Sequence, residues 1–143
     1  MATERKAEVT WQGSLMEGSG SIDTSTSGKL DGLELSWPSR AESAQGKTSP
    51  EDLIAAAHAA CFSMALSHGL AQAGTTADRI HTTATVSFVP GTGITKIELT
   101  VEGTVPGLDE DGFRAAAEDA KANCPVSQAL AGVPEITLDA RLA

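Results

Sequence analysis

The sequence predicts an α+β fold, on three observations. Short segments in which apolar and polar residues alternate occur near both ends of the chain, as in half-buried strands. Between them lies a long stretch without charged residues, which is typical of a buried helix. A second, amphipathic helix is expected before the last alternating segment. This order of strands and helices indicates a layered α+β architecture.

Composition indicates one ordinary globular domain over residues 1–143, with 41% hydrophobic and 20% charged residues. The net charge of -9 and the scattered Lys and Arg residues argue against nucleic acid or a membrane as partner. The N-terminus has charges but no apolar core of a secretory signal, so a cytoplasmic location is expected. Aromatic residues make up only 3%, which disfavours platforms for base or sugar stacking.

The first third of the chain is expected to form short strands and turns. Residues 7–11 alternate, residues 18–25 are rich in Gly, Ser and Thr, and residues 33–37 form a candidate strand that Pro38 stops. The polar segment 39–49 is expected to be a surface loop or lid.

A long helix is predicted from Pro50 to about Ala71. Ser49 can serve as its N-cap, Pro50 suits its first position, and Asp52 completes a start that resembles a capping box. Gly74 is expected to end it.

This helix lies within a segment, residues 53–77, that contains no Asp, Glu, Lys or Arg. A helix without a charged face is expected to be buried on nearly all sides. One domain of this size has difficulty wrapping it, which suggests that a second subunit covers part of it. His58, His68 and the many alanines disfavour a membrane span.

The second half is expected to contain two paired strands, a helix and a closing strand. Residues 80–88 and 97–105 alternate on either side of a Pro-Gly turn and are expected to form an antiparallel pair. Asp109 can cap a helix that is interrupted near Cys124, and residues 136–142 alternate as the closing strand.

Cys61 and Cys124 are the only cysteines, and they are 63 positions apart. This spacing excludes a CxxC motif, so a redox couple assembled by the fold competes with two unconnected buried cysteines. Cys124 precedes Pro125 and should lie at a helix N-cap, where a thiolate is favoured. Cys61 lies about three turns inside its helix, where burial should raise its pKa. By position alone Cys124 is the more reactive thiol.

Cys61 would therefore need an external cation, and Arg40 is the obvious candidate, although most such arginines are simply solvated. Taken alone, Glu51 at the helix start is best explained as a carboxylate that complements the helix dipole. Ten residues separate Glu51 from Cys61, roughly 15 Å along one helix, so it cannot touch the Cys61 of its own helix. If two such helices packed antiparallel in a dimer, Glu51 of one chain could approach the site of the other.

His58 is three residues before Cys61, which permits a Cys/His dyad or a metal-ligand pair. A hydrogen-bonded core histidine is the favoured interpretation, because no third ligand with standard spacing is evident. No GxSxG elbow or phosphate-binding loop occurs, so hydrolase and nucleotide-binding functions lack support.

The segment TSPEDLIAAAHAACFSMALS, which contains Glu51 and Cys61, and the downstream NCPVSQAL, which contains Cys124, resemble the OsmC/Ohr family of bacterial peroxide reductases, most closely its OsmC branch. The resemblance extends over nearly the whole chain. One departure is Ala41, where the branch commonly has Phe after the arginine, a position that bears on peroxide specificity and loop packing.

The resemblance implies an intertwined homodimer, with antiparallel sheets packed around a buried central helix and with sites at the subunit interface. It implies a thiol-dependent peroxidase that reduces organic hydroperoxides, and hydrogen peroxide more slowly, in oxidative or osmotic stress defence. Cys61 would attack the peroxide and Cys124 would resolve the sulfenic acid as a disulfide, with Arg40 held by Glu51 as the activating charge. This order reverses the ranking by helix position.

The resemblance further implies a dithiol reductant, typically a lipoyl group, and neither cofactor nor metal. Two alternatives stay open. One is a thiol-containing binding dimer of the same fold without turnover. The other is a metal site formed by His58, Cys61 and Cys124.

Overall fold

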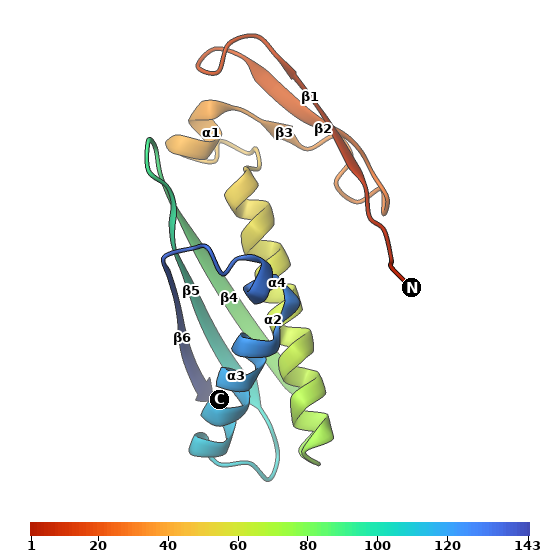
Figure 1. Ribbon diagram of the computed structural model, residues 1–143, viewed down its shortest axis with the longest axis vertical. Helices are drawn as coiled ribbons and strands as arrows, with labels where there is room; N and C mark the ends of the chain where they lie inside the picture. Colours follow the sequence, from red (N-terminus) through yellow and green to blue (C-terminus); the bar gives the residue numbers. More distant parts are fainter. The chain divides into compact units, whose positions relative to one another are not determined.

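The computed structural model describes residues 1–143 (Figure 1). The chain divides into two compact units, the N-terminal unit Met1–Leu53 and the C-terminal unit Ile54–Ala143. The single-domain organisation expected from the sequence stays a prediction.

The N-terminal unit contains a three-stranded antiparallel sheet in the order β1-β2-β3. Its strands are β1 (Ala7–Gln12), β2 (Ser19–Ser25) and β3 (Glu34–Leu35). The strands predicted near residues 7–11 and 18–25 are confirmed. Ile22 is buried at the centre of this sheet.

The strand predicted at residues 33–37 is mostly wrong, because only two of its residues pair and Trp37 already begins helix α1 (Trp37–Ala41). The cause is a capping box: the Ser36 hydroxyl accepts the N–H of Ser39, and the Ser39 hydroxyl accepts the N–H of Ser36. Pro38 therefore lies in the first turn of a helix, where its missing N–H costs nothing. The predicted loop 39–49 shortens accordingly, and Ser39 and Thr48 within it are buried.

Helix α2 (Pro50–Gln72) begins and ends where the sequence predicts. The Ser49 hydroxyl accepts the N–H of Asp52 at 3.1 Å, which confirms the N-cap. The carboxylate of Asp52 accepts the hydroxyl of Thr48 at 2.9 Å. Gly74 follows the last turn with φ +86°, a conformation that favours glycine.

The expectation that α2 is buried on nearly all sides is wrong for the single chain. One stripe is fully buried, formed by His58, Phe62, Leu66 and Leu70. The opposite side, which includes Ala56, Ala60 and Met64, is exposed. α2 is long and apolar enough to cross a membrane, a criterion that the core helix of a soluble protein also meets. Its buried stripe belongs to the main hydrophobic core.

The C-terminal unit contains a second three-stranded sheet in the order β4-β5-β6. Its strands are β4 (Arg79–Val89), β5 (Gly93–Thr104) and β6 (Glu135–Leu142). The antiparallel pairing of β4 with β5 is confirmed. The antiparallel arrangement expected for the sheets does not extend to β6, which pairs parallel to β5. The reason is that a helical crossover joins these two strands, as parallel pairing requires.

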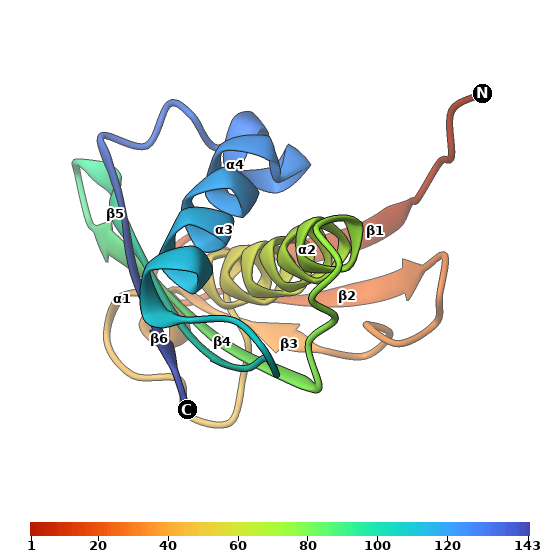
Figure 2. The same cartoon turned by 90° about the horizontal axis from the view of Figure 1, so that it is seen from below.

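That crossover consists of α3 (Glu110–Asn123) and α4 (Pro125–Ala129). The Asp109 carboxylate accepts the N–H of Gly112 at 2.8 Å, so the predicted cap of α3 is confirmed. Within this unit α2 and α3 lie on the same face of the sheet (Figure 2).

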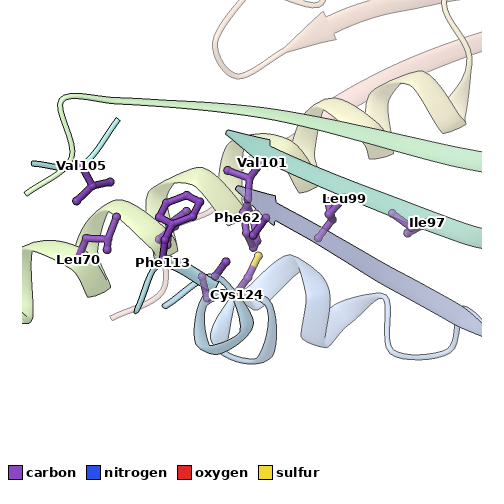
Figure 3. Close-up of a cluster of buried hydrophobic side chains, with 12 residues drawn as sticks. Phe62, Leu70, Ile97, Leu99, Val101, Val105, Phe113 and Cys124 are labelled. Carbon is purple, nitrogen blue, oxygen red and sulfur yellow. The ribbon is translucent and has the colours of Figure 1, made fainter. Parts of the chain in front are cut away.

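The core of the C-terminal unit fills the space between this face and the helices (Figure 3). The alternate residues Ile97, Leu99 and Val101 of β5 are buried in this core, as the sequence pattern predicted. Gly103 continues the row, and a Cβ there would lie 2.5 Å from the ring of Phe113. A side chain at that position would thus displace Phe113 from the core.

Candidate functional site: a thiol pair

Cys61 and Cys124 come together in the C-terminal unit, one from α2 and one from the junction of α3 and α4. Cys124 is completely buried in the hydrophobic core (Figure 3). Cys61 is partly buried against that core. Both thiols are free, and each affects the pKa of the other, so the two side chains are neighbours. This proximity argues against the interpretation of two unconnected buried cysteines.

Pro125 determines the position of Cys124. A residue before proline is disfavoured in helical conformation, and Cys124 adopts φ -62° and ψ 120°, which is extended. It therefore ends α3 as its C-cap and begins α4 as its N-cap, with Pro125 in the first turn. The predicted N-cap position is confirmed.

The pKa of Cys61 is raised above its usual value. Burial is the main cause, because it disfavours the thiolate, and the hydrogen bond with Cys124 adds to it. The backbone of Val126 acts in the opposite direction but does not compensate. No cation of the C-terminal unit contributes, so Cys61 as it stands in this unit is a weakly activated thiol, as its helix position predicted.

The pKa of Cys124 is lowered. Burial alone would raise it, but the hydrogen bond with Cys61, the backbone and hydroxyl of Ser127, and the backbone of Val126 together outweigh burial. The sulfur makes no N-cap hydrogen bond of standard geometry, so these groups act as neighbours that favour negative charge. Within the reduced pair, the negative charge is therefore favoured on Cys124.

His58 is a hydrogen-bonded core histidine, the interpretation favoured from the sequence. It is completely buried, and its Nε2 lies 2.7 Å from the Ser127 hydroxyl. Burial lowers the pKa of His58 below its usual 6.5, so the ring is neutral at pH 7. No group of three or more His, Cys, Asp or Glu residues is arranged to hold a metal ion. The alternative metal site of His58, Cys61 and Cys124 is thus not formed.

Arg40 and Glu51 form an ion pair in the N-terminal unit. The guanidinium donates from Nε to both carboxylate oxygens, at 2.9 and 3.2 Å, and from Nη2 to Oε2 at 2.8 Å. The side chain of Glu51 is 9% exposed and that of Arg40 is 32% exposed. Arg40 is therefore not an exposed loop residue as the sequence suggested, because it lies in the last turn of α1. Such a fork holds a guanidinium in one orientation.

A pocket of about 390 Å³ adjoins Arg40 in the N-terminal unit. Most of its lining is apolar, from β1, β3 and α1. The residues that line it are Val9, Trp11, Leu15, Leu35, Ser36, Trp37, Arg40 and Pro50. The sequence did not predict this pocket, because its lining comes from separate segments of the chain with no common motif.

The four predicted site residues thus form two pairs, one in each unit: Arg40 with Glu51, and Cys61 with Cys124. Sequence reasoning missed Ser127, whose hydroxyl lies 2.7 Å from His58 Nε2 and helps to lower the pKa of Cys124. Its position three residues after Cys124 and two after Pro125 was the available signal, because it places the hydroxyl in the first turn of α4.

A fold with this thiol pair is that of the OsmC-like proteins, whose family description matches residues 42–139. The chain belongs to the OsmC family. It is 46% identical over 145 aligned residues to the peroxiredoxin OsmC of Escherichia coli strain K12, with 99% of each chain covered.

Solved structures agree with this assignment. An organic hydroperoxide resistance protein OsmC from Legionella pneumophila has a TM-score of 0.69 at 26% identity, with 95% of this chain and 96% of that chain covered. The organic hydroperoxide resistance protein OhrB of Bacillus subtilis has a TM-score of 0.65 at 29% identity, with 96% and 98% covered. Glu51, Cys61 and Cys124 fall within the matched family region, and Arg40 lies just before it.

Proposed function

We propose that this protein reduces organic hydroperoxides, and hydrogen peroxide more slowly, with Cys61 as the attacking thiol and Cys124 as the resolving thiol. As a member of the OsmC family with a peroxiredoxin relative at 46% identity, the chain is a peroxide-reducing oxidoreductase. The observation that carries the finer proposal is the proximity of the two thiols, each of which affects the pKa of the other. A sulfenic acid on either one has a partner thiol already in place.

The proposed reaction has two steps. The Cys61 thiolate attacks the distal oxygen of ROOH, so that an S–O bond forms, the O–O bond breaks, and the alkoxide leaves as alcohol after taking a proton. Cys124 then attacks the Cys61 sulfur, an S–S bond forms, and the hydroxyl of the sulfenic acid leaves as water with the proton lost by Cys124. A dithiol reductant returns both thiols by exchange, and we propose a lipoyl-type dithiol in the cytoplasm.

The raised pKa of Cys61 means that the first step requires a cation. We assign this role to Arg40, because Glu51 fixes its guanidinium through three short N···O contacts. A guanidinium can hydrogen-bond both the thiolate and the incoming peroxide oxygen.

We propose that the active protein is a homodimer with residues of both chains around each site. Two features support this. Glu51 lies roughly 15 Å along α2 from the Cys61 of its own helix, by helical rise. The uncharged side of α2, with Ala56, Ala60 and Met64, is exposed in one chain and would be covered by a second copy.

The preference for organic peroxides is supported by the pocket next to Arg40. Its volume of about 390 Å³ and its apolar lining suit an alkyl or aryl group better than a second hydroxyl. A peroxide whose organic part occupied this pocket would lie close to the guanidinium.

Stopped-flow measurement of thiol oxidation tests the proposal. Cumene hydroperoxide should oxidise both thiols within one turnover, faster than hydrogen peroxide does at equal concentration. Equal slow oxidation by both peroxides, at the rate of an unactivated thiol, would instead support the non-catalytic binding dimer. The raised pKa of Cys61 in the C-terminal unit is the observation that favours that second candidate.

A further inference from the structure

His58 is completely buried, but only one of its ring nitrogens has a partner. Nε2 lies 2.7 Å from the Ser127 hydroxyl, whereas Nδ1 contacts no hydrogen-bonding group. A neutral ring carries its proton on one of these nitrogens. A buried N–H without an acceptor costs the full desolvation of a donor, so the network assigns the proton to Nε2. His58 therefore donates to Ser127.

This assignment fixes the direction of the Ser127 hydroxyl. Its oxygen accepts from His58, which leaves its single hydrogen free to point to another acceptor. Ser127 is the third residue of α4 and Cys124 is the N-cap, positions that face each other across the first helical turn. The Ser127 hydroxyl is also one of the groups that lower the pKa of Cys124, so it acts on that sulfur. A hydroxyl hydrogen turned toward the sulfur would complete a one-way chain, from Nε2–H to Oγ and from Oγ–H to Sγ, in which each bond polarises the next.

We propose that His58 and Ser127 form a hydrogen-bond relay that ends on the Cys124 sulfur and stabilises its thiolate for the attack that closes the disulfide. Ser127 contacts the reacting sulfur, and His58 is a positioning residue that acts through Ser127. The relay itself is a property of the reduced protein and does not depend on any reaction with peroxide. Its use in disulfide closure rests on the proposed function.

The chemistry requires no additional reactant. The peroxide has already oxidised Cys61 to the sulfenic acid when the relay acts. The Cys124 thiolate attacks that sulfur, the S–S bond forms as the S–O bond breaks, and the leaving hydroxide takes the proton that Cys124 released. Cys61 from α2 is the other titratable group that acts on Cys124, and the backbone of Val126 and Ser127 from α4 completes its surroundings.

The relay can be tested without turnover. In a Cys61→Ser background the Cys124 thiolate is titrated by ultraviolet absorbance, with and without Ser127→Ala. Loss of the Ser127 hydroxyl should raise the pKa of Cys124, and Ser127→Thr, which keeps the hydroxyl, should restore most of the shift. Circular dichroism and thermal unfolding verify that each variant is folded.

His58 offers a matched pair of amide variants. The side-chain nitrogen of glutamine reaches the position of Nε2, whereas that of asparagine reaches only the position of Nδ1. His58→Gln should keep the Cys124 titration close to that of the parent, and His58→Asn should raise the pKa of Cys124 as Ser127→Ala does. A role confined to fastening α4 to α2 would change the stability of both variants without separating their titrations.

The rate of disulfide closure completes the test in the chain with both cysteines. After one equivalent of cumene hydroperoxide, Ser127→Ala should form the Cys61 sulfenic acid at the parent rate but close the disulfide about tenfold more slowly at neutral pH, the worth of one hydrogen bond to a charged group. Unchanged titration and unchanged closure in folded Ser127→Ala and His58→Asn variants would overturn the relay. If the parent protein forms no sulfenic acid, the proposed function fails, and the Cys124 titration still decides the relay.

Discussion

The two units of this chain differ in how they use apolar side chains. The C-terminal unit buries a continuous cluster from α2, β5 and α3, whereas Ile22 is the single buried large hydrophobic residue of the N-terminal unit. Most of the exposed large hydrophobics lie in the N-terminal unit, and they include Val9, Trp11 and Leu15. The N-terminal unit thus has little core of its own, and it carries the Arg40–Glu51 pair on a surface that further protein could cover.

The difference extends to the chemistry. The C-terminal unit supplies two neighbouring thiols and shifts the charge of the reduced pair toward Cys124. The N-terminal unit supplies a fixed cation, the group that Cys61 lacks. The C-terminal unit therefore supplies the thiols and the N-terminal unit the cation. The proposed mechanism requires both groups within a dimer.

The largest expected effect is on the free energy of unfolding, and it differs between buried residues of the two units. Phe62→Ala should cost about 3–5 kcal/mol in the free energy of unfolding, because it empties the centre of the C-terminal cluster. Ile22→Ala should cost only about 2 kcal/mol, at the lower end for such truncations, because few buried side chains surround it. Urea denaturation measures both, and an equal cost at the two positions would show that the N-terminal unit has a core of its own.

The second prediction concerns the uncharged side of α2. Ala60→Glu should weaken self-association at least about 100-fold, or about 2.7 kcal/mol, since it would place a charge between two helices. Ala115→Glu is the matched control, because Ala115 is also an exposed helical alanine but lies on α3 between charged residues. Sedimentation at several concentrations measures the effect. A monomeric parent protein, or equal behaviour of the two variants, would contradict the proposed dimer.

The third prediction concerns Arg40. Arg40→Ala should slow the oxidation of Cys61 at least about tenfold at neutral pH, because the thiolate loses its cation. It should also cost about 1–3 kcal/mol in stability, because the nearly buried Glu51 carboxylate loses its donors. Arg40→Lys should restore part of the rate, since a point charge does not reproduce the planar fork.

Arg114→Ala is the control for Arg40, since Arg114 is exposed and pairs loosely with Asp111 at 3.7 Å. It should change stability by less than about 0.5 kcal/mol and leave the oxidation rate unchanged. Stopped-flow oxidation and urea denaturation compare the variants, and a normal rate in Arg40→Ala would return that residue to a structural role.

The smallest expected effect is a dependence of stability on pH. Burial holds the pKa of His58 below its usual 6.5, so the unfolded chain binds a proton more readily than the folded one. Stability from this source is complete above pH 6.5 and is lost as the pH falls below it, with a slope of at most about 1.4 kcal/mol per pH unit. Denaturation curves of the parent and His58→Gln, recorded on both sides of pH 6.5, should show a shallower dependence in the variant. Parallel curves would mean that His58 is not responsible.

Local features of the fold were predictable from the sequence. The Ser49 and Asp109 caps, the Gly74 stop and the alternation of β5 depend on neighbouring residues, and each is confirmed. The direction of β6 was not predictable, because it depends on the path of the whole crossover. Pro38 fits both the end of a strand and the first turn of a helix, and the Ser36–Ser39 capping box makes it part of a helix start.

The site was predictable to a similar degree. Helix position gave the raised pKa of Cys61 and the N-cap location of Cys124, and the resemblance to OsmC proteins gave Arg40 and Glu51 as a pair. The bond between His58 and Ser127 spans 69 positions, and no spacing rule connects a helical histidine with a serine in another helix. Contacts between residues so far apart in the sequence become evident only in the tertiary structure.

In the proposed mechanism Cys61 attacks the peroxide, although the C-terminal unit by itself favours negative charge on Cys124. Trapping of sulfenic acid with dimedone in the two single-cysteine variants, followed by mass spectrometry, tests it most directly. After one equivalent of cumene hydroperoxide, Cys124→Ser should carry the label on Cys61 at nearly one per chain, whereas Cys61→Ser should consume no peroxide and stay unlabelled. Rapid labelling of Cys124 in Cys61→Ser, with Cys124→Ser inert, would contradict the account and make Cys124 the attacking thiol.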